Sequence, residues 1–125
     1  MNIVAFTKAD YVCIVCGYTD LRRGIDGLAS IISNDYEMDI FANSVFLFCG
    51  HRSDRYKALH WDGDGFMLLY KRLENGKLQW PKSDNEVRQL TEQQVRWLLE
   101  GLKEEQQKSI KPVNPDHVSW SSQFG

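Results

Sequence analysis

The chain has 125 residues, of which 42% are hydrophobic and 26% charged, a balance typical of one globular domain of ordinary size. Its formal net charge of -2 at pH 7 argues against the strongly basic class of nucleic-acid-binding proteins. No apolar run approaches the length of about 18 residues that a membrane-spanning helix needs, and the first residues lack the pattern of a signal peptide. We therefore expect a cytoplasmic protein, in which three cysteines, an odd number, are reduced thiols.

A strand, a helix and a second strand are the first elements that the sequence predicts. The run 11–16 (YVCIVC) is apolar and β-branched and ends at a glycine, which is typical of a buried strand. Thr19 or Asp20 can cap the helix that follows. This helix has apolar residues at helical spacing, at Leu21, Ile25, Leu28 and Ile32. A second apolar run, 44–49 (SVFLFC), predicts the next strand.

Three more strands are predicted at 55–61, 66–73 and 77–80. Asn75-Gly76 is a favoured two-residue turn for a hairpin, and it would join the last two strands with Leu73 opposite Leu78.

The second predicted helix has a clear start. Thr91 and Gln94 have the spacing of a capping box, and Leu90 and Val95 that of a hydrophobic staple. We expect the helix to fade near Gln107.

This order of elements, with short antiparallel connections after residue 44, predicts a small single α+β domain. Its sheet is expected to be mostly antiparallel, with β-hairpins, and two main helices are expected to pack on one of its faces. We expect residues 1–107 to form this domain and residues 108–125 a flexible C-terminal tail. In that tail Val118, Trp120 and Phe124 could instead dock or contact a partner.

The segment 60–66 (HWDGDGF) allows two interpretations. Asp62 and Asp64 could form a metal or acid–base site, or they could belong to a tight turn, because Asp and Gly tolerate positive φ. A calcium loop needs a ligand at the next alternate position, which is Phe66, so we favour the turn. The turn would align four cross-strand pairs: Trp61 with Phe66, Leu59 with Leu68, Lys57 with Tyr70 and Arg55 with Arg72.

Such a hairpin has two different faces. The face that continues to Leu78 and Trp80 is expected to be the core side. The other face combines basic and aromatic side chains, namely Arg55, Lys57, Trp61, Phe66, Tyr70 and Arg72. It is suited to phosphate contacts and base stacking, although an ordinary solvated face with some aromatics under a helix would look the same.

No cofactor or metal site is predicted. Cys13 and Cys16 match the pattern C-x-x-C, but a zinc site needs four ligands and no second pair has suitable spacing. Residues three apart in a strand also point to opposite faces, so we expect buried thiols.

Four segments resemble a known family. They are CGYTDLRRGIDGL (16–28), DRYKALHWDGDGFMLLYKRLENG (54–76), LQWP (78–81) and LTEQQVRWLLEG (90–101). Over roughly residues 11–102 the chain resembles the accessory protein, called TnpB or Orf2-like, of the insertion sequence 66 group of bacterial mobile elements. The resemblance implies a contribution to transposition beside a transposase that carries the strand-transfer chemistry, and it implies no catalytic residues. Family members often have arginine where this chain has His51, which weakens the basic loop.

Together these observations predict a non-enzymatic accessory factor that binds element DNA, the transposase, or both. The predicted phosphate contacts are Arg22, Arg23, Arg52, Arg55, Lys57, Lys71 and Arg72, with Trp61 and Tyr70 as stacking residues. One alternative is a protein–protein module, in which the arginines pair with transposase carboxylates and Trp97 or the tail aromatics anchor the contact. Another is a metal-dependent nuclease using Asp54, Asp62 and Asp64.

Overall fold

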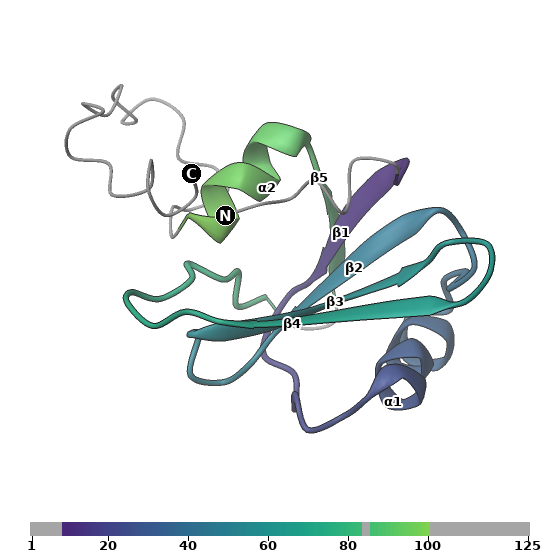
Figure 1. The fold of residues 1–125 in the computed structure, drawn as a ribbon, viewed down its shortest axis with the longest axis horizontal. Helices are drawn as coiled ribbons and strands as arrows, with labels where there is room; N and C mark the ends of the chain where they lie inside the picture. The colour runs from purple at the N-terminus through teal and green to yellow at the C-terminus, as the bar shows by residue number, and fades with distance from the viewer. Residues whose placement is uncertain (1–8, 84–85, 101–125) are drawn as a thin grey trace.

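The computed structural model, which describes residues 9–83 and 86–100, is built on a five-stranded sheet with the strand order β4-β3-β2-β1-β5 (Figure 1). The strands are β1 (Tyr11–Val15), β2 (Ser44–Cys49), β3 (Arg55–Trp61), β4 (Phe66–Arg72) and β5 (Val87–Leu90). The helices are α1 (Ile25–Ser30), its π-helical continuation η2 (Ile31–Asp35) and α2 (Glu92–Leu99). Only the β1–β2 pair is parallel within this sheet. The prediction of a small, mostly antiparallel α+β domain is confirmed.

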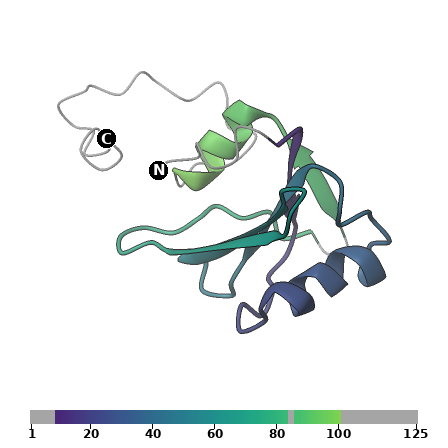
Figure 2. The ribbon, with the colours of Figure 1, turned by 45° about the vertical axis from the view of Figure 1, so that its right-hand side comes forward.

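The two helices cover opposite faces of the sheet, so the prediction that both lie on one face is wrong (Figures 1 and 2). All six residues of β2 are buried, and a strand that is apolar on both sides needs cover on both sides. On one face Leu28 and Ile32 pack with Phe46 and Leu59. On the other face α2 packs its apolar residues, Val95, Leu98 and Leu99, against Ile14, Val45, Leu47 and Tyr56. Among residues 9–83 and 86–100, none of the helices combines the length and the apolar character that a membrane span requires.

The first helix begins later than its apolar spacing suggests. The segment 20–24 forms a turn, in which the carboxylate of Asp20 accepts the backbone N–H of Arg22 at 3.0 Å. Helix α1 then starts after Gly24 and ends through η2, where the Tyr36 N–H donates to the Ile31 carbonyl at 3.2 Å. A side chain that hydrogen-bonds the backbone, as Asp20 does before α1, competes with helix formation.

The predicted strand at 77–80 does not form, and the predicted pairing of Leu73 with Leu78 is wrong. After β4 the Leu73 and Leu78 N–H groups donate instead to the carbonyls of Asp54 and Ser53, at 2.6 and 2.7 Å. The chain then crosses to the far edge of the sheet, where β5 pairs antiparallel with β1. Burial of Leu78 and Trp80 in the α2-side core outweighs the few backbone bonds of a marginal edge hairpin.

The start of α2 agrees with its predicted capping box. The Thr91 hydroxyl accepts the Gln94 N–H at 3.1 Å, and the Gln94 side-chain oxygen accepts the Thr91 N–H at 2.8 Å. Both members of the expected staple, Leu90 and Val95, are buried. The predicted fading of this helix near Gln107 and the predicted tail at 108–125 lie outside the described residues.

Trp80 offers a direct test of the path between β4 and β5. Its indole N–H donates to the carbonyl of Val15 at 2.9 Å, and the ring is 4% exposed. Trp80→Phe should lower the free energy of unfolding by about 1–3 kcal/mol, because a buried carbonyl loses its donor. Urea denaturation measures this value. The control is Trp97→Phe, which changes a half-buried ring of α2. An equal decrease in the free energy of unfolding for both variants would contradict the role of the Trp80 hydrogen bond in fixing this path.

Candidate nucleic-acid interface

The segment HWDGDGF forms the turn between β3 and β4. One carboxylate oxygen of Asp62 accepts the backbone N–H groups of Asp64 and Gly65, at 2.9 and 3.0 Å. The Asp62 N–H donates to the Gly65 carbonyl at 3.1 Å, and Gly63 has a φ of 99°. The two backbone hydrogen bonds hold the pKa of Asp62 below its usual range. This carboxylate therefore shapes the backbone.

The turn sets the cross-strand pairing that the sequence predicts. Arg55 pairs with Arg72, Lys57 with Tyr70, Leu59 with Leu68 and Trp61 with Phe66. Because side chains alternate along a strand, this register decides which residues of the hairpin share the α1 side of the sheet.

One end of the hairpin brings basic side chains from three segments together. The Lys57 ammonium donates to the carbonyl of Arg23 at 3.0 Å and lies 5.5 Å from the ring centre of Tyr70. The Arg55 guanidinium donates to the Tyr70 hydroxyl at 3.3 Å. We call this surface the basic end, and it consists of Arg22, Arg23, Arg52, Arg55, Lys57, Tyr70 and Arg72.

The parallel pairing of β1 and β2 explains why these segments meet. The carboxyl ends of parallel strands lie at the same edge of a sheet, so the loops that follow β1 and β2 are neighbours. Both strands run into Cys-Gly, at 16–17 and 49–50. Gly50 fits closely beneath its neighbours, since a Cβ there would lie 3.1 Å from the Leu21 side chain and 3.3 Å from that of Arg55.

Three carboxylates are interleaved with the cations of the basic end, and the sequence analysis did not predict their ion pairs. Ion pairs join Arg22 to Asp20 at 2.9 Å, Arg55 to Asp54 at 2.9 Å and Arg72 to Glu74 at 2.8 Å. Hydrogen bonds from Arg22 lower the pKa of Asp20 to about 2, and those from Arg55 lower that of Asp54. The available signal for these ion pairs was an acidic residue one or two positions from each of the three arginines in the sequence. Six cations still outnumber three carboxylates.

Tyr18 is a second feature of this end that the sequence analysis missed. Its ring packs edge-on against His51 with 5.4 Å between ring centres, and its hydroxyl lies 3.3 Å from that of Ser53. The ring is 39% exposed. The available signal in the sequence was the shared pattern of a strand followed by Cys-Gly, just before Tyr18 and just before His51. The parallel pairing of β1 and β2 brings these two loops together.

Two predicted contact residues lie away from the basic end. Trp61 is at the opposite end of β3 from Arg55, about 20 Å away along the strand, where it packs against Phe41 and Phe66. Lys71 pairs in register with Tyr56, a residue of the α2-side core, and therefore points to the other face.

The structure does not gather the three carboxylates that the nuclease interpretation requires. Asp54 precedes β3, whereas Asp62 and Asp64 follow it, so the strand separates them by about 26 Å. Asp54 is also ion-paired with Arg55. Within residues 9–83 and 86–100, no cluster of three or more His, Cys, Asp or Glu side chains is arranged to hold a metal ion.

All three cysteines are buried. Burial raises the pKa of the Cys49 thiol to about 12 and raises those of Cys13 and Cys16. Cys13 and Cys16 lie in the cores on opposite faces of the sheet, in agreement with the spacing argument. They therefore pack as apolar side chains.

The family model described as "IS66 Orf2 like protein" matches residues 10–109. The chain belongs to this family. The match extends through every strand, both helices and the whole basic end, so the resemblance seen in the sequence is confirmed, and with it a role as an accessory protein in transposition of an insertion sequence.

Two relatives from Sinorhizobium fredii, both described as uncharacterized proteins, are similar to this chain. The protein y4jC is 32% identical over 83 residues, which are 66% of this chain and 71% of y4jC. The protein y4hO is 30% identical over 91 residues, which are 73% of this chain and 79% of y4hO. No solved structure matches.

Asp62→Ala should lower stability at neutral pH, because two backbone N–H groups lose their acceptor. Since the folded state lowers the pKa of Asp62, the charged carboxylate stabilises the fold above the ordinary value of 3.8, and this contribution is lost as pH falls through the lowered pKa. The difference between variant and wild type should therefore narrow in acid, as measured by thermal unfolding at several pH values. Asp64→Ala is the control, and a difference that is independent of pH would contradict this role.

Proposed function

We propose that this protein serves transposition in the cytoplasm as a non-catalytic DNA-binding factor, which holds phosphates of the element DNA on its basic end and also associates with the transposase. The observation that carries the proposal is the cross-strand pair of Arg55 and Arg72. Like charges directly opposite each other destabilise a sheet, and here each arginine has one carboxylate neighbour, Asp54 or Glu74. A phosphate bound between the two arginines would bring them a shared anion. Arginine binds phosphate in a bidentate manner with its planar fork of donors.

The remaining basic residues extend this surface. Neither Arg23 nor Arg52 forms a side-chain ion pair with another described residue, and both are exposed. Tyr70 is 52% exposed in the middle of the cations, which is the arrangement needed for a base to stack beside a held phosphate. The three interleaved carboxylates limit the excess charge, so we expect moderate affinity that depends strongly on salt.

Arg72 and Lys71 form a matched pair for testing this surface, since they are adjacent cations on opposite faces of β4. Arg72→Ala should weaken binding to the terminal DNA of the element and reduce the slope of log K against log salt by about 0.9, because one phosphate contact is lost. Lys71→Ala should change both much less. Fluorescence anisotropy at several salt concentrations measures both quantities.

Glu74→Gln provides a test in the opposite direction. This variant releases Arg72 from its ion pair and should strengthen DNA binding. The DNA-binding proposal is wrong if wild-type protein shows no binding at low salt, or if Lys71→Ala weakens binding as much as Arg72→Ala does.

A second candidate is a protein–protein module in which the basic end pairs with carboxylates of the transposase. The three ion pairs already present favour this candidate, because they show that these arginines can adopt carboxylate-binding geometry. This candidate is favoured if association with the transposase survives nuclease treatment and is lost in Arg72→Ala. If nuclease treatment abolishes the association, DNA binding is favoured instead. Of the aromatic residues predicted to anchor such a contact, Trp97 lies in the described part of the chain, where it is half-buried in α2.

A further inference from the structure

Three aromatic rings cluster at the end of the hairpin opposite to the basic end. Phe41 comes from the loop before β2, and Trp61 and Phe66 flank the turn between β3 and β4. The ring centres lie 5.0 Å apart for Phe41–Trp61, 5.8 Å for Phe41–Phe66 and 5.0 Å for Trp61–Phe66. Phe41 is 58% exposed. Its neighbour Ile40 is 7% exposed and packs in the α1-side core, so Ile40 anchors this loop while the ring of Phe41 remains outside.

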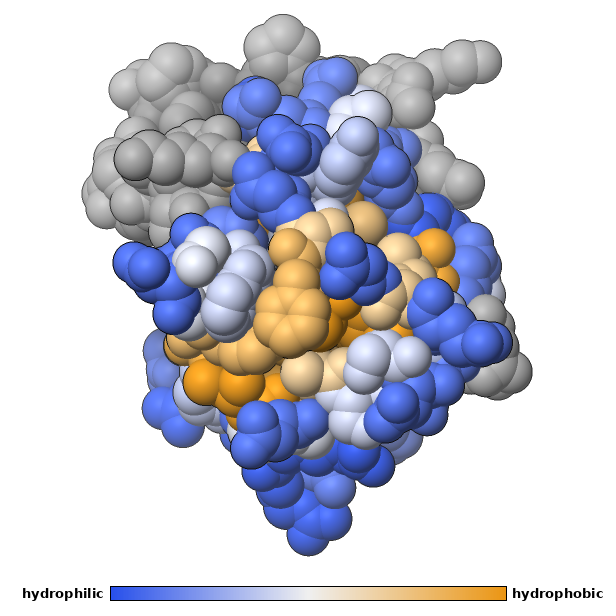
Figure 3. All heavy atoms as spheres, turned by 90° about the vertical axis from the view of Figure 1, so that its right-hand side faces the viewer, coloured by the Kyte–Doolittle hydropathy of each residue, from blue (hydrophilic) through white to orange (hydrophobic). Residues whose placement is uncertain are grey.

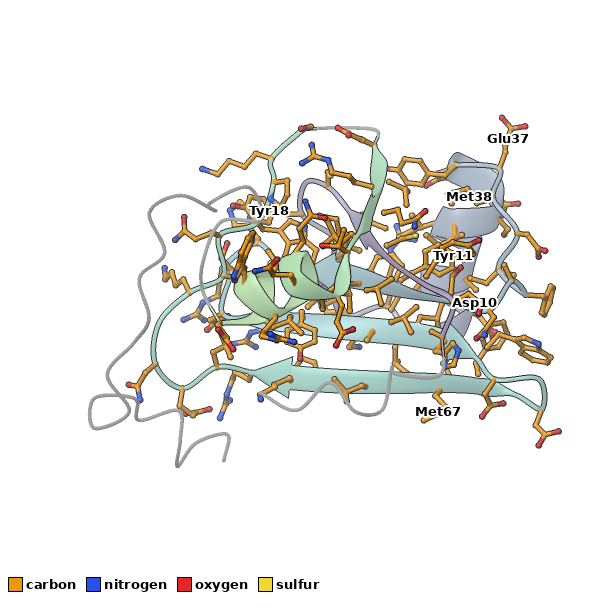
Figure 4. The ribbon with its side chains drawn as sticks, turned by 90° about the horizontal axis from the view of Figure 1, so that it is seen from above. Asp10, Tyr11, Tyr18, Glu37, Met38 and Met67 are labelled. Atoms are coloured by element: carbon orange, nitrogen blue, oxygen red, sulfur yellow. The ribbon has the colours of Figure 1, made fainter. Side chains whose placement is uncertain are left out.

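Other apolar side chains extend the cluster into a larger surface. Tyr11 and Met38 are 50% and 36% exposed, and both lie at the end of the molecule opposite to Tyr18 (Figure 4). Viewed from this side, the molecule has an apolar area surrounded by hydrophilic residues (Figure 3). We call the surface formed by Tyr11, Met38, Phe41, Trp61 and Phe66 the aromatic end.

Among the described residues that build the aromatic end, the charges have one sign. The segments that build it, 9–13, 31–43 and 58–68, contain no lysine or arginine. They contain six acidic residues, namely Asp10, Asp35, Glu37, Asp39, Asp62 and Asp64. The described part of the chain therefore has an excess of cations at one end of the hairpin and carboxylates around aromatic rings at the other.

Local backbone structure fixes several of these groups. The carboxylate of Asp39 accepts the backbone N–H of Phe41 at 2.9 Å, which holds this carboxylate beside the backbone of the residue with the exposed ring. The wide turn at the end of η2, in which the Met38 N–H donates to the Ile32 carbonyl at 3.0 Å, holds Glu37 at a φ of 54°. Positive φ is uncommon for a residue other than glycine, and here it leaves both Glu37 and Met38 exposed.

We propose that the aromatic end binds a segment of a partner protein in which arginine or lysine side chains stand beside apolar ones. A cation is attracted both to the face of an aromatic ring and to the surrounding carboxylates, while apolar side chains of the partner would cover the exposed rings. The same carboxylates repel phosphate, so this end is closed to nucleic acid. The inference is independent of DNA binding by the basic end, and the two surfaces can be occupied together.

A nitrogen-15 NMR titration of the full chain tests this inference. The probe is a short peptide in which arginines alternate with leucines, and the control peptide has glutamates in place of the arginines. The arginine peptide should give saturable shifts in the signals of residues 37–41 and in the indole N–H of Trp61. Phe41→Ala should weaken its binding about tenfold, by removal of one well-placed ring. Phe41→Leu should also weaken it, because leucine keeps apolar contact but loses the ring face.

Charge and fold are controlled separately. Glu37→Gln should weaken binding of the arginine peptide, Arg72→Ala at the basic end should leave it unchanged, and the spectrum of each variant reports whether the chain is folded. The inference is wrong if these signals do not shift, or if the glutamate peptide shifts them equally. It is also wrong if they shift with protein concentration alone, since a second copy of the chain would then be the occupant.

Discussion

The turn at Asp62 sets the strand register on which both the basic end and the aromatic end depend. One carboxylate accepts two backbone N–H groups, and the register that follows pairs Arg55 with Arg72 and Trp61 with Phe66. A slip of one residue would move every side chain of one strand to the other face, which would separate the cations from one another and the rings from one another. The aspartate therefore serves the site by positioning residues about 20 Å away along the strands.

The sheet keeps the two surfaces apart. Strands β3 and β4 are each seven residues long, so the basic end and the aromatic end lie at opposite ends of one rigid hairpin. The first is suited to phosphate and the second to a cationic protein segment. We propose that an accessory protein with both surfaces holds DNA at one end of the hairpin and a protein partner at the other.

Local signals in the sequence predicted the local structure well. The apolar runs, the capping box at Thr91 and the hairpin register all follow from short-range rules, and each is present in the structure. The path after Asn75-Gly76 was mispredicted because it depends on tertiary burial of Leu78 and Trp80. Placement of the helices on one face also failed, since the sequence does not state which face each apolar stripe meets. The aromatic end was missed because Phe41 is distant from Trp61 in sequence.

Mapping DNA directly onto the structure tests the central claim, that the two ends of the hairpin have separate ligands. Nitrogen-15 NMR of the full chain, titrated with a short duplex from the terminus of the element, follows the backbone N–H groups of both ends at once. We expect shifts at residues 22–23, 52–57 and 70–72, with the signals of residues 37–41 and 61–66 unchanged. Shifts centred on Phe41 and Trp61, or no shifts at low salt, would contradict it.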